Sequence, residues 1–415
     1  MNIVIITYES GDLLGFWFEI KTYETNNHRH ISDIGVTAYL RGLFLSHNED
    51  IGPKGSKSTG SFITTGTQAM IRVGIIGASG YAGAELARII CNHPETELTV
   101  ATSRQYEGQP LSEVFPNLRG KVDIVCENLS PKELTEKADV FFAAVPHKTA
   151  MDLVPVLLDA GKKVIDLSAD FRIKDVATYE DWYQPHSSSH LLDEAVYGLP
   201  ELYRSSIRQS RLIANPGCYP TSIILGLAPL LKNGIIAPES IIADSKSGTT
   251  GAGRSAQTGS LFCEVHDGFR PYKVGRAHRH TPEIEQELSL LAGSDFHITF
   301  TPHLLPIARG ILSTVYANLT KETTTSAIQE LYENQYKDEP FIRLLKEDTF
   351  PATQYVRGSN FCDISFKIDH TTNRIIVMTA IDNVVKGAAG QAVQNMNIMS
   401  GLPEDMGLLT APMFP

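Results

Sequence analysis

The stretch AMIRVGIIGASGYAG, residues 69–83, constrains the fold more than any other part of the chain. A short, branched apolar run over residues 71–76 leads into glycines and then into a segment of helical period over residues 81–91. This order predicts a strand, a tight turn and a helix. Gly77, Gly80 and Gly83 let backbone N–H groups approach a pyrophosphate at the helix N-terminus. Their G-x-x-G-x-x-G spacing is not the commoner G-x-G-x-x-G, so a merely structural glycine turn is the alternative.

Further strands and helices are expected on both sides of residue 235. Residues 97–103, 139–146 and 162–170 are strand-like and alternate with helix-like segments over 131–138 and 151–161, which predicts a parallel sheet. Strand-like runs at 241–248, 296–305, 310–319, 361–370 and 374–383 predict a second, mixed or largely antiparallel sheet. Residues 384–401 return to helical spacing. We therefore expect an α/β dinucleotide-binding domain followed by an α+β domain.

The residues that end the second strand bear on the choice of cofactor. An NAD site would place Asp or Glu there, whereas this chain has Thr102, Ser103 and Arg104. A hydroxyl and a guanidinium suit a 2′-phosphate, so NADP(H) is the predicted cofactor. The alternative is that Arg104 is only a solvated loop cation.

Composition excludes several classes of partner. The 415 residues carry a net charge of −11 without a run of Lys or Arg, which argues against nucleic acid. No apolar run approaches the roughly 20 residues of a membrane span. Five cysteines without a CxxC pair indicate neither a disulfide framework nor a metal site, and a reducing cytoplasm fits this usage.

Residues 1–69 are expected to be an extension of the functional body. Residues 48–68 are rich in Gly, Ser and Thr and are typical of a linker. Met70 stands directly before the first strand of the dinucleotide fold, which leaves 415 − 69 = 346 residues. We expect the extension to be dispensable or an upstream mis-start. An accessory or targeting segment is the alternative, and Glu9 and Asp12 disfavour a secretory signal.

The stretch IANPGCYPTSI, residues 213–223, contains a candidate nucleophile. Cys218 precedes an expected amphipathic helix whose first turn includes Pro220. A helix dipole contributes about 0.3–1 kcal/mol, which lowers a thiol pKa by less than about one unit. A nearby base is therefore needed if Cys218 is to react, and a buried apolar role is the alternative.

The stretch GRAHRHTPEIEQEL, residues 275–288, offers that base. His278 and His280 lie on a loop that feeds a helix for which Thr281 is the expected cap. If the loop is extended, both imidazole rings face the same side, so the spacing does not show which histidine lies near Cys218. A zinc site lacks a third ligand beside the pair, and a hydrogen-bonding loop role stays open.

Five motifs resemble the N-acetyl-γ-glutamyl-phosphate reductase family: DLSADFR at 166–172, NPGCYPTS at 215–222, SGTTGAGR at 247–254, HRHTPEIEQ at 278–286 and NVVKGAAGQAVQNMN at 383–397. The resemblance runs from Met70 to Pro415. It implies a Rossmann domain, residues 70–217 with 384–415, and a catalytic and oligomerisation domain, residues 218–383, with the C-terminal helix returning to the first domain. It also implies NADPH-dependent reduction of an acyl phosphate by a homodimer or homotetramer.

The resemblance implies roles for single residues as well. The nucleophile is Cys218, and the acid/base role is given to His278 rather than to His280. Arg172, Arg254 and His280 are predicted to bind the anionic substrate, with Arg279 as a further option. Each arginine could instead form only a structural ion pair. The predicted cofactor contacts are Gly77, Ser79, Gly80, Tyr81, Ala82, Gly83, Ser103, Arg104, Ser168, Asn383 and Lys386, with Gly387 beside the nicotinamide.

Three other functions are compatible with these residues. A reductase of the same architecture could act on another acyl phosphate, such as aspartyl phosphate. A cysteine hydrolase or acyltransferase could use the glycine turn only structurally. A nucleotide sensor could bind the cofactor without catalysis.

Overall fold

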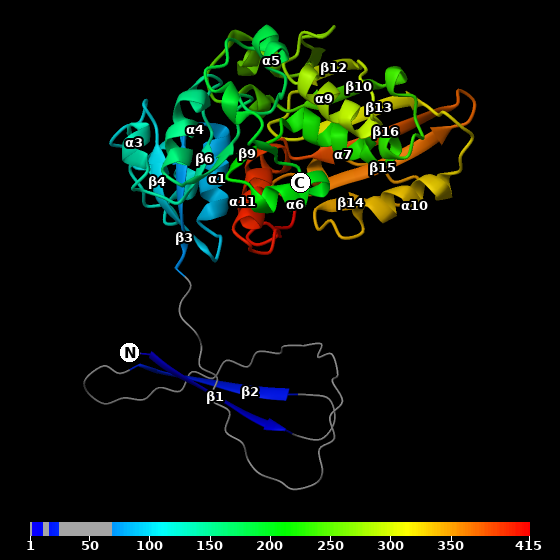
Figure 1. Cartoon of the computed structure of the whole chain (residues 1–415). Helices are drawn as coiled ribbons and strands as arrows, with labels where there is room; N and C mark the ends of the chain where they lie inside the picture. Colours follow the sequence, from blue (N-terminus) through cyan, green and yellow to red (C-terminus); the bar gives the residue numbers. More distant parts are fainter. Residues whose placement is uncertain (1, 11–15, 25–68) are drawn as a thin grey trace. The chain divides into compact units, whose positions relative to one another are not determined.

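The computed structural model describes residues 2–10, 16–24 and 69–415 (Figure 1). The chain divides into two compact units, residues 1–67 and 68–415. In the first unit, β1 (Asn2–Ser10) pairs antiparallel with β2 (Phe16–Glu24). The predicted linker at 48–68 lies outside the described residues. Everything below concerns the second unit.

A seven-stranded parallel sheet forms the N-terminal half of the second unit, in the order β5-β4-β3-β6-β7-β9-β8. The predicted α/β alternation is therefore confirmed, whereas the short strands β5, β8 and β9 were not predicted. The strands are β3 (Ile71–Ile76), β4 (Thr96–Thr102), β5 (Cys126–Glu127), β6 (Val140–Ala143), β7 (Lys163–Asp166), β8 (Val196–Tyr197) and β9 (Leu212–Ala214). The helices are α1 (Tyr81–Ile90), α2 (Leu111–Val114), α3 (Pro131–Leu134), α4 (Thr149–Asp159), α5 (Val176–Trp182) and α6 (Pro200–Gln209).

A mixed seven-stranded sheet forms the second half, in the order β11-β12-β10-β13-β16-β15-β14. The pairs β10/β12 and β14/β15 are parallel and the others antiparallel, which confirms the predicted α+β part. The strands are β10 (Ile242–Ser247), β11 (Arg270–Pro271), β12 (Thr299–Leu304), β13 (Ile311–Asn318), β14 (Ile342–Leu344), β15 (Cys362–Asp369) and β16 (Arg374–Ile381). Its helices are α7 (Cys218–Lys232), α8 (Phe262–Val265), α9 (Thr281–Ala292) and α10 (Thr325–Tyr336).

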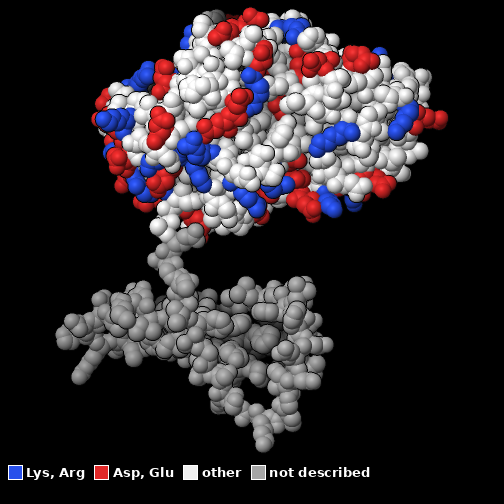
Figure 2. All heavy atoms as spheres, viewed as in Figure 1, with Lys and Arg blue, Asp and Glu red and all other residues white. Residues whose placement is uncertain are grey.

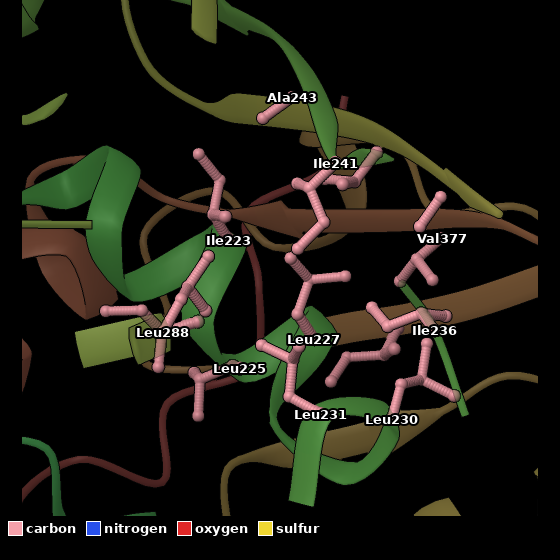
Figure 3. Close-up of a cluster of buried hydrophobic side chains, with 14 of the residues drawn as sticks. Ile223, Leu225, Leu227, Leu230, Leu231, Ile236, Ile241, Ala243, Leu288 and Val377 are labelled. Carbon is pink, nitrogen blue, oxygen red and sulfur yellow. The ribbon is translucent and has the colours of Figure 1, made fainter. Parts of the chain in front are cut away.

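Helix α7 is the centre of the second hydrophobic core. Every residue from Tyr219 to Leu231 is buried, because the helix lies between α9 and the mixed sheet. Figure 3 shows its side chains against Leu288 of α9 and Val377 of β16. The predicted amphipathic pattern is therefore wrong: a helix that is apolar on all sides is buried on all sides.

The chain ends by returning to the parallel sheet. After β16, a π-helical turn η7 (Val385–Ala389) leads into α11 (Gly390–Met399), which Figure 1 shows beside α6. Val393 and Met396 share a core with Ile75 and Ile165 of the sheet, as the resemblance implied. The residue boundaries predicted for the two domains stay a prediction.

Figure 2 shows acidic and basic side chains interspersed on the face in view, with no field of one sign. Among the described residues, no helix is long and apolar enough to cross a membrane.

Lys386, predicted to lie near the nicotinamide, is instead fully buried between η7 and α6. Its Nζ donates to Glu201 Oε1 at 2.6 Å and to Gln394 Oε1 at 2.9 Å. The side chain does not line the cavity described below, so its position argues for a structural ion pair and against a cofactor contact.

We predict that Lys386→Met lowers the thermal unfolding midpoint strongly, because it leaves Glu201 buried without its counter-charge. Breaking such a pair costs about 3–5 kcal/mol, whereas replacing both partners with apolar residues costs far less. Calorimetry on Lys386→Met and on the double variant Lys386→Met/Glu201→Leu checks this. Equal midpoints for the two variants would contradict the electrostatic explanation.

Candidate active site

A cavity of about 610 Å³ opens at the carboxyl ends of the parallel strands. Ligands of open α/β sheets bind at this edge. The cavity is lined from the first sheet by the glycine turn and the loops after β4, β6 and β7. From the other side it is lined by residues 250, 251, 253–256, 383, 384, 387 and 388. It therefore lies between the two sheets.

The glycine turn fits a pyrophosphate. Gly77 has φ +87°, and a side chain there would collide with the Ala144 carbonyl. Gly80 is the N-cap of α1 and provides no side-chain cap, so the first N–H groups of the helix stay open to an anion. Ser79, Tyr81 and Ala82 line the cavity as predicted. Gly83 does not line it; it lets α1 start close to the Gly77 carbonyl.

The end of β4 supports this turn. Thr102 Oγ1 accepts the Gly77 N–H at 3.2 Å, and Ser103 Oγ donates to Ser79 Oγ at 2.9 Å. Ser103 is buried and Arg104 exposed, and neither lines the cavity itself; the next residues, Gln105 and Tyr106, do.

Two other predicted cofactor contacts, Ser168 and Asn383, already form hydrogen bonds within the protein. Ser168 is 2% exposed, and its hydroxyl donates to Asp166 Oδ2 at 2.8 Å. Asn383 lines the cavity, but its amide already accepts the Gly310 N–H and donates to Thr250 Oγ1. Ser168 therefore orders the loop after β7, and Asn383 holds the wall of the cleft.

Cys218 is the first residue of α7, in the turn that follows β9. Its N-cap, Gly217, has no side chain to cap the helix. A Cβ added to Gly387 would lie 2.7 Å from Cys218 Cβ, so only glycine lets the π-helical turn pack against the cysteine. Burial raises the pKa of the Cys218 thiol to about 11, although the Tyr219 N–H and the Arg172 charge oppose this. Burial therefore outweighs the small lowering of the pKa that was expected from the helix dipole.

A second cavity, of about 430 Å³, adjoins the first. Cys218, Gly251, His147 and His280 line both cavities. The second cavity also contains three cationic side chains, Arg270, Lys273 and Arg279. Below, the first cavity is called the nucleotide cleft, because the glycine turn lines it, and the second is called the cationic cavity. Cys218 thus lies where the nucleotide cleft meets the cationic cavity.

The two loop histidines differ in their contacts. His278 lines only the second cavity; its Nδ1 accepts the His280 N–H at 3.1 Å, and its Nε2 lies 3.4 Å from the Tyr272 hydroxyl. The His280 ring packs against Gly217, and its buried Nδ1 has no partner among the described residues. Burial lowers the pKa of both imidazoles, so both are neutral. Because His280 lines both cavities with Cys218, it is a better candidate for the base than the predicted His278, which lines only one of them. Thr281, the expected cap, is instead the first residue of α9 and makes no capping bond.

Arg172, predicted to bind substrate, is a buried structural residue. Its Nη1 pairs with Glu283 Oε2 at 3.2 Å, and its other nitrogens donate to the carbonyls of Asn215 and Leu167, both at 2.7 Å. Glu283 Oε1 accepts the Gly217 N–H at 2.8 Å. Although Arg172 borders the first cavity, its donors serve the turn that holds Cys218.

Arg254 lies on the nucleotide side of the cleft, away from the second cavity. Its Nη1 donates to the Ser79 carbonyl at 3.0 Å. Its guanidinium stacks 4.4 Å from the Phe115 ring centroid and 5.2 Å from that of Tyr106. This position favours a contact with a nucleotide over the predicted contact with the acyl substrate.

The sequence did carry a signal for one site residue that was not predicted. His147 follows the predicted strand at 139–146, at the sheet edge where ligands bind. Arg270 and Lys273 had no such signal, because they lie in a segment without helical or strand period.

Comparison with known proteins decides the family. Residues 72–210 match the model of the semialdehyde dehydrogenase NAD-binding domain, and residues 218–383 match that of the semialdehyde dehydrogenase dimerisation domain. An N-acetyl-gamma-glutamyl-phosphate reductase from Desulfotalea psychrophila is 69% identical over 346 residues, which is 83% of this chain and 100% of the relative. One from Geobacter sp. is 59% identical over the same spans.

The chain belongs to the N-acetyl-gamma-glutamyl-phosphate reductase family. Members of the wider semialdehyde dehydrogenase group share its fold. Aspartate semialdehyde dehydrogenase II from Vibrio cholerae, solved with ASA, superposes with a TM-score of 0.62 at 17% identity, over 80% of this chain and 99% of that one. The enzyme from Candida albicans, solved with NADP, gives 0.60 at 15% identity over the same shares. These matches establish the fold of this chain and the presence of an NAD(P)-binding domain.

We predict that alkylation of Cys218 accelerates with pH. With a pKa of about 11, the thiolate fraction rises about tenfold per pH unit, so the rate constant at pH 9 should be about 100 times that at pH 7. Iodoacetamide labelling of the Cys218 peptide, followed by mass spectrometry, measures it, and the exposed Cys263 in the same digest is the internal control. A plateau near pH 7 would show an ionised thiol and contradict this pKa.

Proposed function

We propose that this chain reduces N-acetyl-γ-glutamyl phosphate to N-acetylglutamate 5-semialdehyde and phosphate, with NADPH, through a thioester on Cys218. The observation that carries the proposal is the position of Cys218, at a helix N-terminus where the nucleotide cleft meets the cationic cavity. The names of the close relatives support the same reaction.

The first half of the reaction needs only residues of this chain. The Cys218 sulfur attacks the acyl carbon while its proton passes to the neutral His280 imidazole. The bond from carbon to the phosphate oxygen then breaks, phosphate leaves, and a thioester remains. Because the free thiol is protonated, the attack depends on this proton transfer. The negative charge of a bound acyl phosphate favours protonation of His280, which makes it a better base in the complex.

The chemistry that NADPH supplies when bound is hydride donation to the thioester carbon. Afterwards the carbon–sulfur bond breaks as the oxygen of the former carbonyl group forms the aldehyde, and His280 returns to the sulfur the proton that it took from Cys218 in the first half. The aldehyde leaves, and Cys218 is again a thiol. His278, which accepts the His280 N–H, positions that loop.

The second cavity suits the anionic ends of the substrate. Its cations, Arg270, Lys273 and Arg279, face the phosphate and the α-carboxylate in this proposal. Arg254 is assigned to the cofactor and not to the substrate. Arg104 keeps its predicted position at the 2′-phosphate of the cofactor. An aspartate-semialdehyde dehydrogenase-like activity on another acyl phosphate is the weaker alternative, since those proteins share only 15–17% identity with this chain.

We also propose that the chain works as a homodimer formed through its mixed sheet. Alternate residues of β13, Leu312, Thr314 and Tyr316, face away from the core and are only half-buried within one chain. The dimerisation-domain match covers these residues. A second copy on this face would complete their burial.

The reverse reaction tests the proposal. NADP, phosphate and N-acetylglutamate semialdehyde should give NADPH absorbance with the wild type, and Cys218→Ser should lose the rate almost completely. Succinic or aspartic semialdehyde serves as the control substrate. A Cys218→Ser variant with the wild-type rate would rule out the covalent route, and turnover only with aspartic semialdehyde would favour the alternative.

The choice of cofactor gives a second prediction. A charged hydrogen bond contributes about 1.5–3 kcal/mol, so Arg104→Gln should weaken NADPH binding about 10- to 100-fold and leave NADH binding unchanged. Arg254→Gln should weaken both. Titration of nicotinamide fluorescence measures the dissociation constants, with the exposed Arg119→Gln as control. An equal loss of NADPH and NADH binding in Arg104→Gln would contradict the 2′-phosphate assignment.

A further inference from the structure

A third histidine lies at the junction of the two cavities. His147, in the loop after β6, is one of the four residues that line both, with Cys218, Gly251 and His280. The acyl carbon must lie at this junction, since it has to reach both Cys218 and the nucleotide cleft. The mechanism proposed above assigns no role to His147.

The surroundings of His147 fix its protonation. Its Nδ1 accepts the Ala169 N–H at 3.1 Å, so the proton of the neutral ring is on Nε2. Burial, followed by the charges of Arg172 and Arg279, lowers the pKa of His147 to about 4. The ring of Tyr183 packs edge-on against it, with centroids 5.2 Å apart. His147 is therefore an oriented, neutral donor near pH 7.

We propose that His147 is a catalytic residue that donates a hydrogen bond from Nε2 to the carbonyl oxygen of the acyl group. The inference rests on the proposed function. When the Cys218 sulfur adds to the carbonyl, negative charge develops on this oxygen, and an oriented donor stabilises it more in the transition state than in the ground state. A neutral imidazole does this without giving up its proton. His280 remains free to act on the sulfur proton.

The test is the burst of phosphate that accompanies thioester formation, measured by rapid quench without any cofactor. His147→Phe keeps a ring but has no donor, and it should slow the burst about 100- to 1000-fold. His147→Gln places an amide N–H near the position of Nε2 and should recover part of the rate. The rate of Cys218 alkylation should stay at the wild-type value in both variants, which shows that the thiol and the fold are intact. His190→Phe, at an exposed histidine of the same half, is the matched control.

Each outcome decides the proposal. A wild-type burst rate in His147→Phe would overturn it. Equal slowing in His147→Phe and His147→Gln would also overturn it, because an N–H donor near the position of Nε2 would then recover none of the rate. If the wild type itself released no phosphate, the proposed function would fail and this inference with it, whereas a wild-type burst that persists in the variants refutes only the role of His147.

Discussion

The buried ion pair between Arg172 and Glu283 holds the candidate active site together. Arg172 comes from the loop after β7, and Glu283 from the first turn of α9. Through its other donors Arg172 binds the carbonyls of Leu167 and Asn215, and Glu283 binds the Gly217 N–H. Both side chains are nearly inaccessible to water. Loss of one partner from a buried ion pair destabilises a protein far more than loss from a pair at the surface. One pair thus fixes the turn of Cys218 relative to the histidine loop.

Burial is also what gives the site its chemistry. The same packing that orders Cys218 raises its pKa, and it keeps the nearby imidazoles neutral. The free protein therefore holds a protonated thiol near neutral imidazoles, and in the proposed function the reactive form arises when an anionic substrate binds. Such an arrangement protects the thiol from unspecific reaction until the substrate is bound.

Regular patterns in the sequence were enough to predict the fold and the position of Cys218 at the start of a helix. The alternation of strands and helices, the glycine turn and the position of Cys218 before a helix all arise from local periodicity and backbone preference, and the structure has each of them. Short strands such as β9, with three residues, have too little period to be recognised.

Roles that depend on distant partners could not be predicted in the same way. Arg172 and Lys386 resemble ligand-binding cations in the sequence, but their counter-ions are Glu283 and Glu201, more than 100 residues away in each case. The preference for His280 over His278 depends on the packing against Gly217, which spacing does not contain. Tertiary contacts, not local pattern, decide whether a charged residue serves the fold or the substrate.

If Cys218 forms a covalent acyl intermediate, as proposed, the mass of the protein changes during the reaction. The wild type, mixed with N-acetyl-γ-glutamyl phosphate without NADPH and quenched in acid, should gain the mass of one N-acetylglutamyl group, and peptide mapping should place it on Cys218. The adduct should disappear when NADPH is added before the quench. Release of phosphate and turnover without any adduct, or with an adduct on another residue, would contradict a covalent role of Cys218.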